Sequence, residues 1–271
     1  MPRDRTPRCL TIATSDSGGG AGIQADIKAF AAAGCHGASV VVAVTAQNTT
    51  GVSLVHALPP SVVTEQLHAV FDDLGIDAMK TGALVSADVV ETVASFLDAR
   101  SREGLPPLVV DPVVQSTTGK ALLDKAGVDV LRTRLLPHAA VVTPNDAEAI
   151  VLAGNDGSRA ELAERLVELG AGAVVITGGA GAPSDHVFDG REHLDIAVQR
   201  VPSHATHGGG CTHSATLCAE LAKGRDVLRA ARIAAMTASA AIGRGLDDIG
   251  RGEGPVDVID LAARRRIGVA E

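Results

Sequence analysis

Short runs of consecutive apolar residues alternate along the chain with longer amphipathic segments. Five runs share β-branched residues and glycine, proline or polar flanks: residues 10–13, 39–44, 108–110, 139–142 and 173–176. Because successive positions are apolar, the runs are typical of strands covered on both faces, as in a parallel sheet. Residues 185–188 and 194–198, on either side of Asp189-Gly190, predict an antiparallel edge.

The segments between these runs have helical spacing. In residues 86–100, Ser86 suits an N-cap, and Val89, Val93 and Leu97 fall on one stripe. Helices are also expected at residues 23–33, 61–74, 159–169, 212–223 and 226–243. No linker or repeat divides the chain. The alternation predicts a single α/β domain over residues 1–271, with a three-layer, doubly wound, mostly parallel sheet flanked by helices.

Composition and charge argue against several classes of protein. Trp and Tyr are absent from the 271 residues, which argues against the aromatic platforms of single-strand nucleic-acid binders. The net charge of −8 gives no basic footprint for a polyanion. No apolar run approaches the roughly 18 residues of a membrane span. The N-terminus lacks the pattern of a signal peptide, and the four cysteines form no CxxC pair. We expect a cytoplasmic protein without a nucleic-acid or membrane partner.

Polar, turn-forming residues follow each of the five apolar runs. In chain order these segments read SDSGGGAGIQAD, TAQNT, DPVV, TPNDAEA and TGGAG. Ligands of open parallel sheets bind beyond the carboxyl ends of the strands. The five segments therefore predict one cleft at that edge of the sheet.

The glycine-rich stretch at residues 18–22 precedes a predicted helix and lets backbone approach a ligand closely. Gly20, Gly22 and Ala25 match a dinucleotide fingerprint, but no acidic residue stands about 20 positions later. The sequence DSGG also occurs in chymotrypsin-like nucleophile loops, but almost nothing precedes Asp16 that could supply the His and Asp. A plain flexible turn remains the other interpretation.

A second glycine stretch, Gly208, Gly209 and Gly210, leads through Cys211 into a predicted helix. Free amide N–H groups and the helix dipole make such an end an anion hole, and they would favour the Cys211 thiolate. Two alternatives are a glycine hinge and a metal site built from His204, His207, Cys211 and His213, whose spacing fits no standard zinc motif. A Walker A motif is absent around Gly119-Lys120, because Ala121 follows the lysine.

Several side chains beside these runs allow two roles each. Asp111 ends a buried run, and with Glu148 it either caps local structure or organises Mg²⁺. Asn145 and Glu148 have the spacing of a helix cap. Asp26 is either exposed helix surface or part of the cleft, and Gln47 can read the edge of a heterocycle because its amide both donates and accepts.

Together the segments SDSGGGAGIQAD, TAQNTTGV, DAMKTG, VDPV, VTPNDAEA and HGGGCTHSA resemble one family over roughly residues 8 to 250. It is the hydroxymethylpyrimidine kinase/phosphomethylpyrimidine kinase family of thiamine biosynthesis, which has the ribokinase-like fold. The resemblance implies that the aminopyrimidine binds Gln47, Asp26 and Gly22, and that Gly208, Gly209, Gly210 and Cys211 form the anion hole. Cys211 stands where many ribokinase-like enzymes have a catalytic Asp.

The resemblance also implies the cofactors and the partners. ATP is expected at Thr177, Gly178, Gly179 and Asn145, Mg²⁺ at Asp111 and Glu148, and the active form is expected to be a homodimer. The implied reaction is ATP-dependent phosphorylation of hydroxymethylpyrimidine and then of its monophosphate. A pyridoxal kinase of the same fold, a ligand-binding module without catalysis and a dehydrogenase are the alternatives.

Three positions depart from the family pattern. Thr14 replaces a usual Gly, Ala83 replaces a frequent Met that packs on the pyrimidine, and Thr177 replaces a frequent Lys near the ATP phosphates. The change at Thr177 bears most directly on nucleotide affinity, because it removes a cation from the phosphate site.

Overall fold

The computed structural model describes residues 5–115, 119, 121–178, 183–199 and 201–267, and their strands form one sheet. Its order is β3-β2-β1-β4-β5-β6-β7-β8-β9. The strands are β1 (Arg8–Asp16), β2 (His36–Asn48), β3 (Gly51–Ala57), β4 (Ala78–Thr81), β5 (Leu108–Val110), β6 (Ala139–Val142), β7 (Val174–Ile176), β8 (Ser184–Phe188) and β9 (His193–Ala197). From β2 to β7 neighbouring strands are parallel, whereas β3, β8 and β9 run antiparallel to their neighbours.

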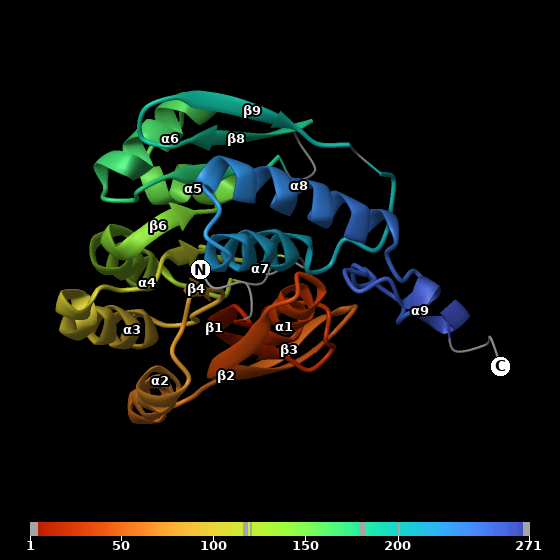
Figure 1. Cartoon of the computed structure of the whole chain (residues 1–271), viewed down its shortest axis with the longest axis horizontal. Coiled ribbons are helices and arrows are strands. Elements are labelled where there is room, and N and C mark those ends of the chain that lie inside the picture. The colour runs from red at the N-terminus through yellow and green to blue at the C-terminus, as the bar shows by residue number, and fades with distance from the viewer. Residues whose placement is uncertain (1–4, 116–118, 120, 179–182, 200, 268–271) are drawn as a thin grey trace.

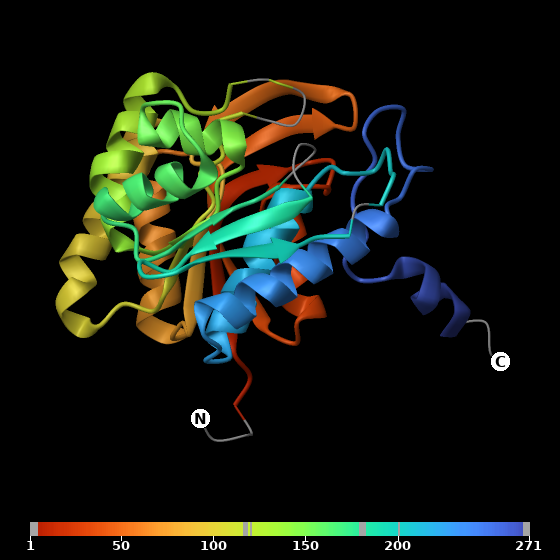
Figure 2. The ribbon, with the colours of Figure 1, turned by 90° about the horizontal axis from the view of Figure 1, so that it is seen from above.

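Helices cover both faces of this sheet (Figures 1 and 2). One face carries α2 (Pro60–Asp73), α3 (Ala87–Arg100), α4 (Lys125–Val130), α5 (Asp146–Ala153) and α6 (Arg159–Glu168). The other carries α1 (Gly22–Ala32), α7 (Gly209–Ala222) and α8 (Val227–Gly243), and α9 (Leu261–Ile267) lies near the C-terminus. Leu108 and Val110 of β5 pack into the first core and Val109 packs into the second, as expected of a strand covered on both sides.

The predicted three-layer architecture is confirmed, and two strands were missed. β3 is an edge strand whose residues are all partly or fully exposed, so it has no continuous apolar run. β4 is four residues long and contains a lysine, Lys80, at a fully buried position. No helix in the described part of the chain is long and apolar enough to cross a membrane.

Candidate active site

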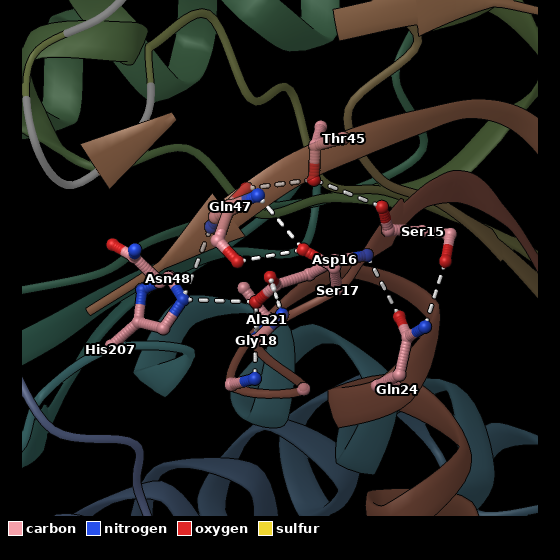
Figure 3. Close-up of polar contacts among 12 residues, drawn as sticks. Ser15, Asp16, Ser17, Gly18, Ala21, Gln24, Thr45, Gln47, Asn48 and His207 are labelled. Atoms are coloured by element: carbon pink, nitrogen blue, oxygen red, sulfur yellow. Dashed lines mark hydrogen bonds and ion pairs between the residues drawn. The ribbon is translucent and has the colours of Figure 1, made fainter. Parts of the chain in front are cut away.

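The carboxyl end of β1 leads into a glycine loop organised by one carboxylate. Asp16 is 3% exposed, and its carboxylate accepts the N–H groups of Gly18 at 2.8 Å, Gly20 at 3.1 Å and Ala21 at 2.8 Å (Figure 3). Burial would raise the pKa of this carboxyl, but the hydrogen bonds from His207 and from the loop amides outweigh burial and hold the pKa below its usual range. The loop conformation therefore depends on an ionised Asp16.

The mouth of α7 lies against this loop. Gly208, its N-cap, has φ 86°, and a Cβ there would lie 1.8 Å from the carbonyl oxygen of Gly20, so only glycine fits. The Gly209 N–H donates to Thr206 O at 3.0 Å, but the N–H groups of Gly210 and Cys211 donate to no backbone or side-chain acceptor among the described residues. A Cβ on Gly210 would meet no atom within 4 Å. The mouth is open and presents two unused donors.

A fully buried lysine joins two carboxylates near Cys211. Lys80 Nζ lies 2.8 Å from Asp26 Oδ1 and 3.5 Å from Asp111 Oδ2, and Thr11 Oγ1 donates to Asp26 Oδ2 at 2.6 Å. Lys80 and Asp26 are both 0% exposed. Asp26 is therefore not exposed helix surface, and its contact with the substrate stays a prediction. Lys80 was missed because its partners lie 54 and 31 positions away; the only signal was a lysine in an apolar context.

Cys211 is half-buried and lies close to the N–H of Gly22, which donates to its sulfur. Burial raises the pKa of the Cys211 thiol to about 12; the Lys80 charge lowers it, whereas the carboxylates of Asp26 and Asp111 raise it. The expectation that the helix end favours a thiolate is therefore wrong, since burial and two carboxylates outweigh the dipole. Gly22 contributes through its backbone: with φ 57°, a Cβ there would lie 2.3 Å from Thr14 O.

Asp111 and Glu148 form a second pair of acidic groups. Ser214 Oγ donates to Asp111 Oδ2 at 2.7 Å. Asn145 and Glu148 form a reciprocal capping box at the start of α5, so the capping role is present. Burial, followed by the Asp111 charge, raises the pKa of Glu148 to about 7. The described residues contain no group of three or more His, Cys, Asp or Glu side chains placed to hold a metal, which removes the alternative site at His204, His207, Cys211 and His213.

The segment after β7 lies beside Asn145. Thr177 N–H donates to Pro144 O at 2.8 Å and forms a bridge with Asn145. Gly178 N–H donates to Asp185 Oδ1 at 2.8 Å, so this amide already has an acceptor, and the expected contact of Gly178 with a nucleotide stays a prediction. Gly179 lies outside the described residues.

The register between β2 and β3 shifts at Ala46/Gln47, where Ser53 of β3 is the extra residue, and the Gln47 side chain lies beside His207 at the mouth of α7 (Figure 3). Its amide nitrogen lies 3.3 Å from His207 Nε2, and its amide oxygen accepts from Thr45 Oγ1 at 3.2 Å. A small hollow borders it, lined by Gln47, Asn48, Thr49, Gly51, Val52, His207 and Glu253. His207 immediately precedes Gly208, so Gln47 and the two free donors belong to one region.

Two of the three departures from the family pattern touch each other. Thr14 Oγ1 donates to the carbonyl oxygen of Ala83 at 2.8 Å, which ties the end of β1 to the loop after β4. Thr14 is 6% exposed. These two substitutions therefore act on the same wall of the cleft.

Known proteins resemble this chain over most of its length. A family model described as phosphomethylpyrimidine kinase matches residues 16–257. A hydroxymethylpyrimidine/phosphomethylpyrimidine kinase of Rhizobium meliloti is 44% identical over 260 residues, which cover 93% of this chain and 96% of that protein. A thiamine biosynthesis bifunctional protein of Geobacter sulfurreducens is 44% identical over 94% of this chain, but the match spans only 52% of that longer protein. An ADP complex of Bacillus subtilis pyridoxal kinase has a TM-score of 0.86 and 34% identity, covering 95% of this chain and 99% of that one.

Proposed function

Because the chain belongs to the phosphomethylpyrimidine kinase family, we propose that it phosphorylates 4-amino-5-hydroxymethyl-2-methylpyrimidine and then the resulting monophosphate, for thiamine diphosphate biosynthesis. ATP is the phosphoryl donor, in line with the ADP bound to the structural relative. In each step the acceptor oxygen bonds to the γ-phosphorus, the bond from that phosphorus to the bridging oxygen breaks, and ADP leaves. In the first step the hydroxyl proton of the acceptor passes to water.

The observation that carries this proposal is the open mouth of α7. The N–H groups of Gly210 and Cys211 have no acceptor among the described residues, and the helix dipole adds positive potential at the same place. Phosphoryl transfer depends mainly on position and on stabilisation of the equatorial oxygens. Two fixed amide donors supply that stabilisation without needing to reorganise during the reaction.

The acidic pair fits a divalent cation. Asp111 and Glu148 come close enough for the charge of one to raise the pKa of the other, and a cation between them would relieve that repulsion. Two carboxylates, with water and phosphate oxygens completing the shell, are the donor set that Mg²⁺ prefers. Asp111 and Glu148 would hold the ion, which would neutralise charge on the ATP phosphates.

Cys211 serves as a backbone donor rather than as a base. With a thiol pKa of about 12, it keeps its own proton near neutral pH. Loose phosphoryl transfer needs little removal of the acceptor proton before bond formation. In the second step the acceptor is already an anion, so no base is needed.

An ADP-release assay tests the proposal with three acceptors: the free pyrimidine, its monophosphate and pyridoxal. ADP release that depends on both pyrimidine acceptors, and that exceeds release with pyridoxal, is the expected result. Faster turnover of pyridoxal would favour the other activity found on this fold, and pyrimidine binding by calorimetry without ADP release would indicate a binding module. A reaction without added acceptor measures background ATP hydrolysis. A homodimer and a cytoplasmic location stay predictions.

A further inference from the structure

His207 lies where ring recognition and the phosphoryl cradle meet, and the family motifs assign it no role. Its Nε2 atom is 3.1 Å from Asp16 Oδ2 and 3.3 Å from the amide nitrogen of Gln47 (Figure 3). His207 as a whole is 7% exposed, and a Cβ on Gly20 would lie 2.3 Å from its Cδ2. The imidazole therefore packs against the glycine loop and contacts Gln47 at the edge of the hollow that both residues line.

The main chain of His207 is fixed on both sides. Its N–H donates to Gly254 O at 3.1 Å, and its carbonyl oxygen accepts from Val256 N–H at 3.0 Å. The next residue is Gly208, which begins α7. Because the backbone of His207 is held on both sides, the position of its imidazole relative to the first N–H groups of α7 is fixed.

The chemistry of the two groups decides which atom donates in the hydrogen bond between His207 and Asp16. A carboxylate only accepts, so Nε2 carries a hydrogen and donates it to Asp16. The amide nitrogen of Gln47 then finds no acceptor in Nε2, and it has no other acceptor among the described residues. It remains a donor for a ligand, and a ring nitrogen is the acceptor that suits it.

We propose that His207 is a positioning residue. Its Nε2–H donates to Asp16 in the glycine loop beneath the phosphoryl cradle, and the same atom packs against the Gln47 amide, which it keeps in place and leaves as a hydrogen-bond donor to the substrate ring. This inference rests on the proposed function. His207 does not touch the reacting atoms. It makes the placement of the ring and the placement of the phosphate depend on one imidazole.

A double-mutant cycle on kcat/KM for the pyrimidine tests the coupling. We expect His207→Leu to lower kcat/KM on the order of 30-fold, the effect of losing a hydrogen bond to a charged group. In a Gln47→Ala background the same change should leave the pyrimidine KM nearly unchanged, because no side chain remains to be positioned. His207→Gln, whose amide nitrogen can replace Nε2, should recover most of the loss.

Gln24→Ala is the matched control. Gln24 also braces the loop, since its amide oxygen accepts from Asp16 N–H at 2.9 Å and its nitrogen donates to Ser15 Oγ at 2.8 Å. No hydrogen bond joins it to Gln47 among the described residues, so its effect should multiply with that of Gln47→Ala to within about twofold.

The possible results distinguish a failure of the positioning role from a failure of the proposed function. If His207→Leu and Gln47→Ala multiply like the control pair, the positioning role is refuted while the kinase activity stands. If the unmodified enzyme releases no ADP with any pyrimidine acceptor, the proposed function fails instead. Should His207→Leu not fold, His207→Asn, whose shorter side chain lacks a group in the place of Nε2, replaces it in both Gln47 backgrounds; coupling in KM supports the inference, and an absence of coupling overturns it.

Discussion

The N–H of Gly210 is the most direct point at which to test the phosphoryl cradle. Gly210→Pro removes this one donor and changes little else. Proline is accepted in the first turn of a helix, and the preceding residue is a glycine, so no Cβ clashes with the proline ring. Gly210→Ala is the control, because it keeps the N–H and its Cβ would meet no atom within 4 Å.

The expected magnitude follows from the geometry. Gly210 N–H is one of two donors at the mouth of α7 that have no acceptor among the described residues. Loss of one preorganised donor to a developing negative charge lowers kcat by about 10²–10³-fold. Gly210→Ala should change kcat by less than about threefold, and it should stabilise the helix by roughly 0.5–1 kcal/mol.

Steady-state ADP release with saturating ATP and pyrimidine measures kcat for both variants, and thermal unfolding confirms that both are folded. The reasoning is refuted if Gly210→Pro keeps a Tm near that of the unmodified protein and loses less than about tenfold in kcat. It is also refuted if the alanine variant loses as much as the proline variant, because the N–H would then not be the cause.

Three further predictions follow from the buried charges. Cys211→Ala keeps the backbone donor and should lower the rates of the two phosphorylation steps by similar factors of less than about tenfold. The two rates are measured with separate acceptors, and a selective loss of the first would indicate that Cys211 acts as a general base. Lys80→Met leaves two carboxylates without their cation and should destabilise the protein by about 3–5 kcal/mol in denaturant unfolding. Adding Asp26→Asn should recover part of the lost unfolding free energy. No recovery would show that the loss comes from packing and not from charge. Glu148→Gln keeps the capping box but cannot ionise. Because the pKa of Glu148 is raised to about 7, ionisation destabilises the fold progressively between the unfolded pKa of about 4.5 and pH 7. The variant should therefore exceed the unmodified protein in unfolding free energy at pH 8 without Mg²⁺, and equal it below pH 4; an advantage that persists at pH 4 would contradict the assignment.

The sequence was sufficient for the parallel core and for the edge of the sheet at which polar segments follow the strands. Consecutive apolar residues in 108–110 and 139–142 correspond to the strands β5 and β6, and polar segments follow them at one edge. The same pattern failed for β3 and β4, because an exposed edge strand and a four-residue strand with a lysine lack such runs. Apolar runs therefore identify most of the strands covered on both faces, but they miss an exposed edge strand such as β3 and a short buried strand interrupted by a charge such as β4.

The side chains that organise the site could not be predicted because their partners are distant in the chain. Asp16 and His207 are 191 positions apart, and Lys80 and Asp26 are 54 apart. Asp26 shows the consequence: a carboxylate on an amphipathic helix is compatible with an exposed position or with one in the cleft, and the sequence does not reveal that it is buried and paired with Lys80 of β4. Only the fold reveals that the helix turns this residue inward.

The contrast between predicted and missed residues has a physical cause. At the mouth of α7 the ligand-facing groups are mainly main-chain amides, and glycines let them come close: Gly208 against Gly20 O, and Gly22 against Thr14 O. Glycine-rich motifs are therefore visible in the sequence. The charged and imidazole groups act from behind this backbone, with Asp16 holding three loop amides and Lys80 holding two carboxylates near Cys211. Since backbone donors have no side chain to vary, the proposed function places differences in acceptor choice at the remaining walls, which the Thr14–Ala83 contact and Gln47 form.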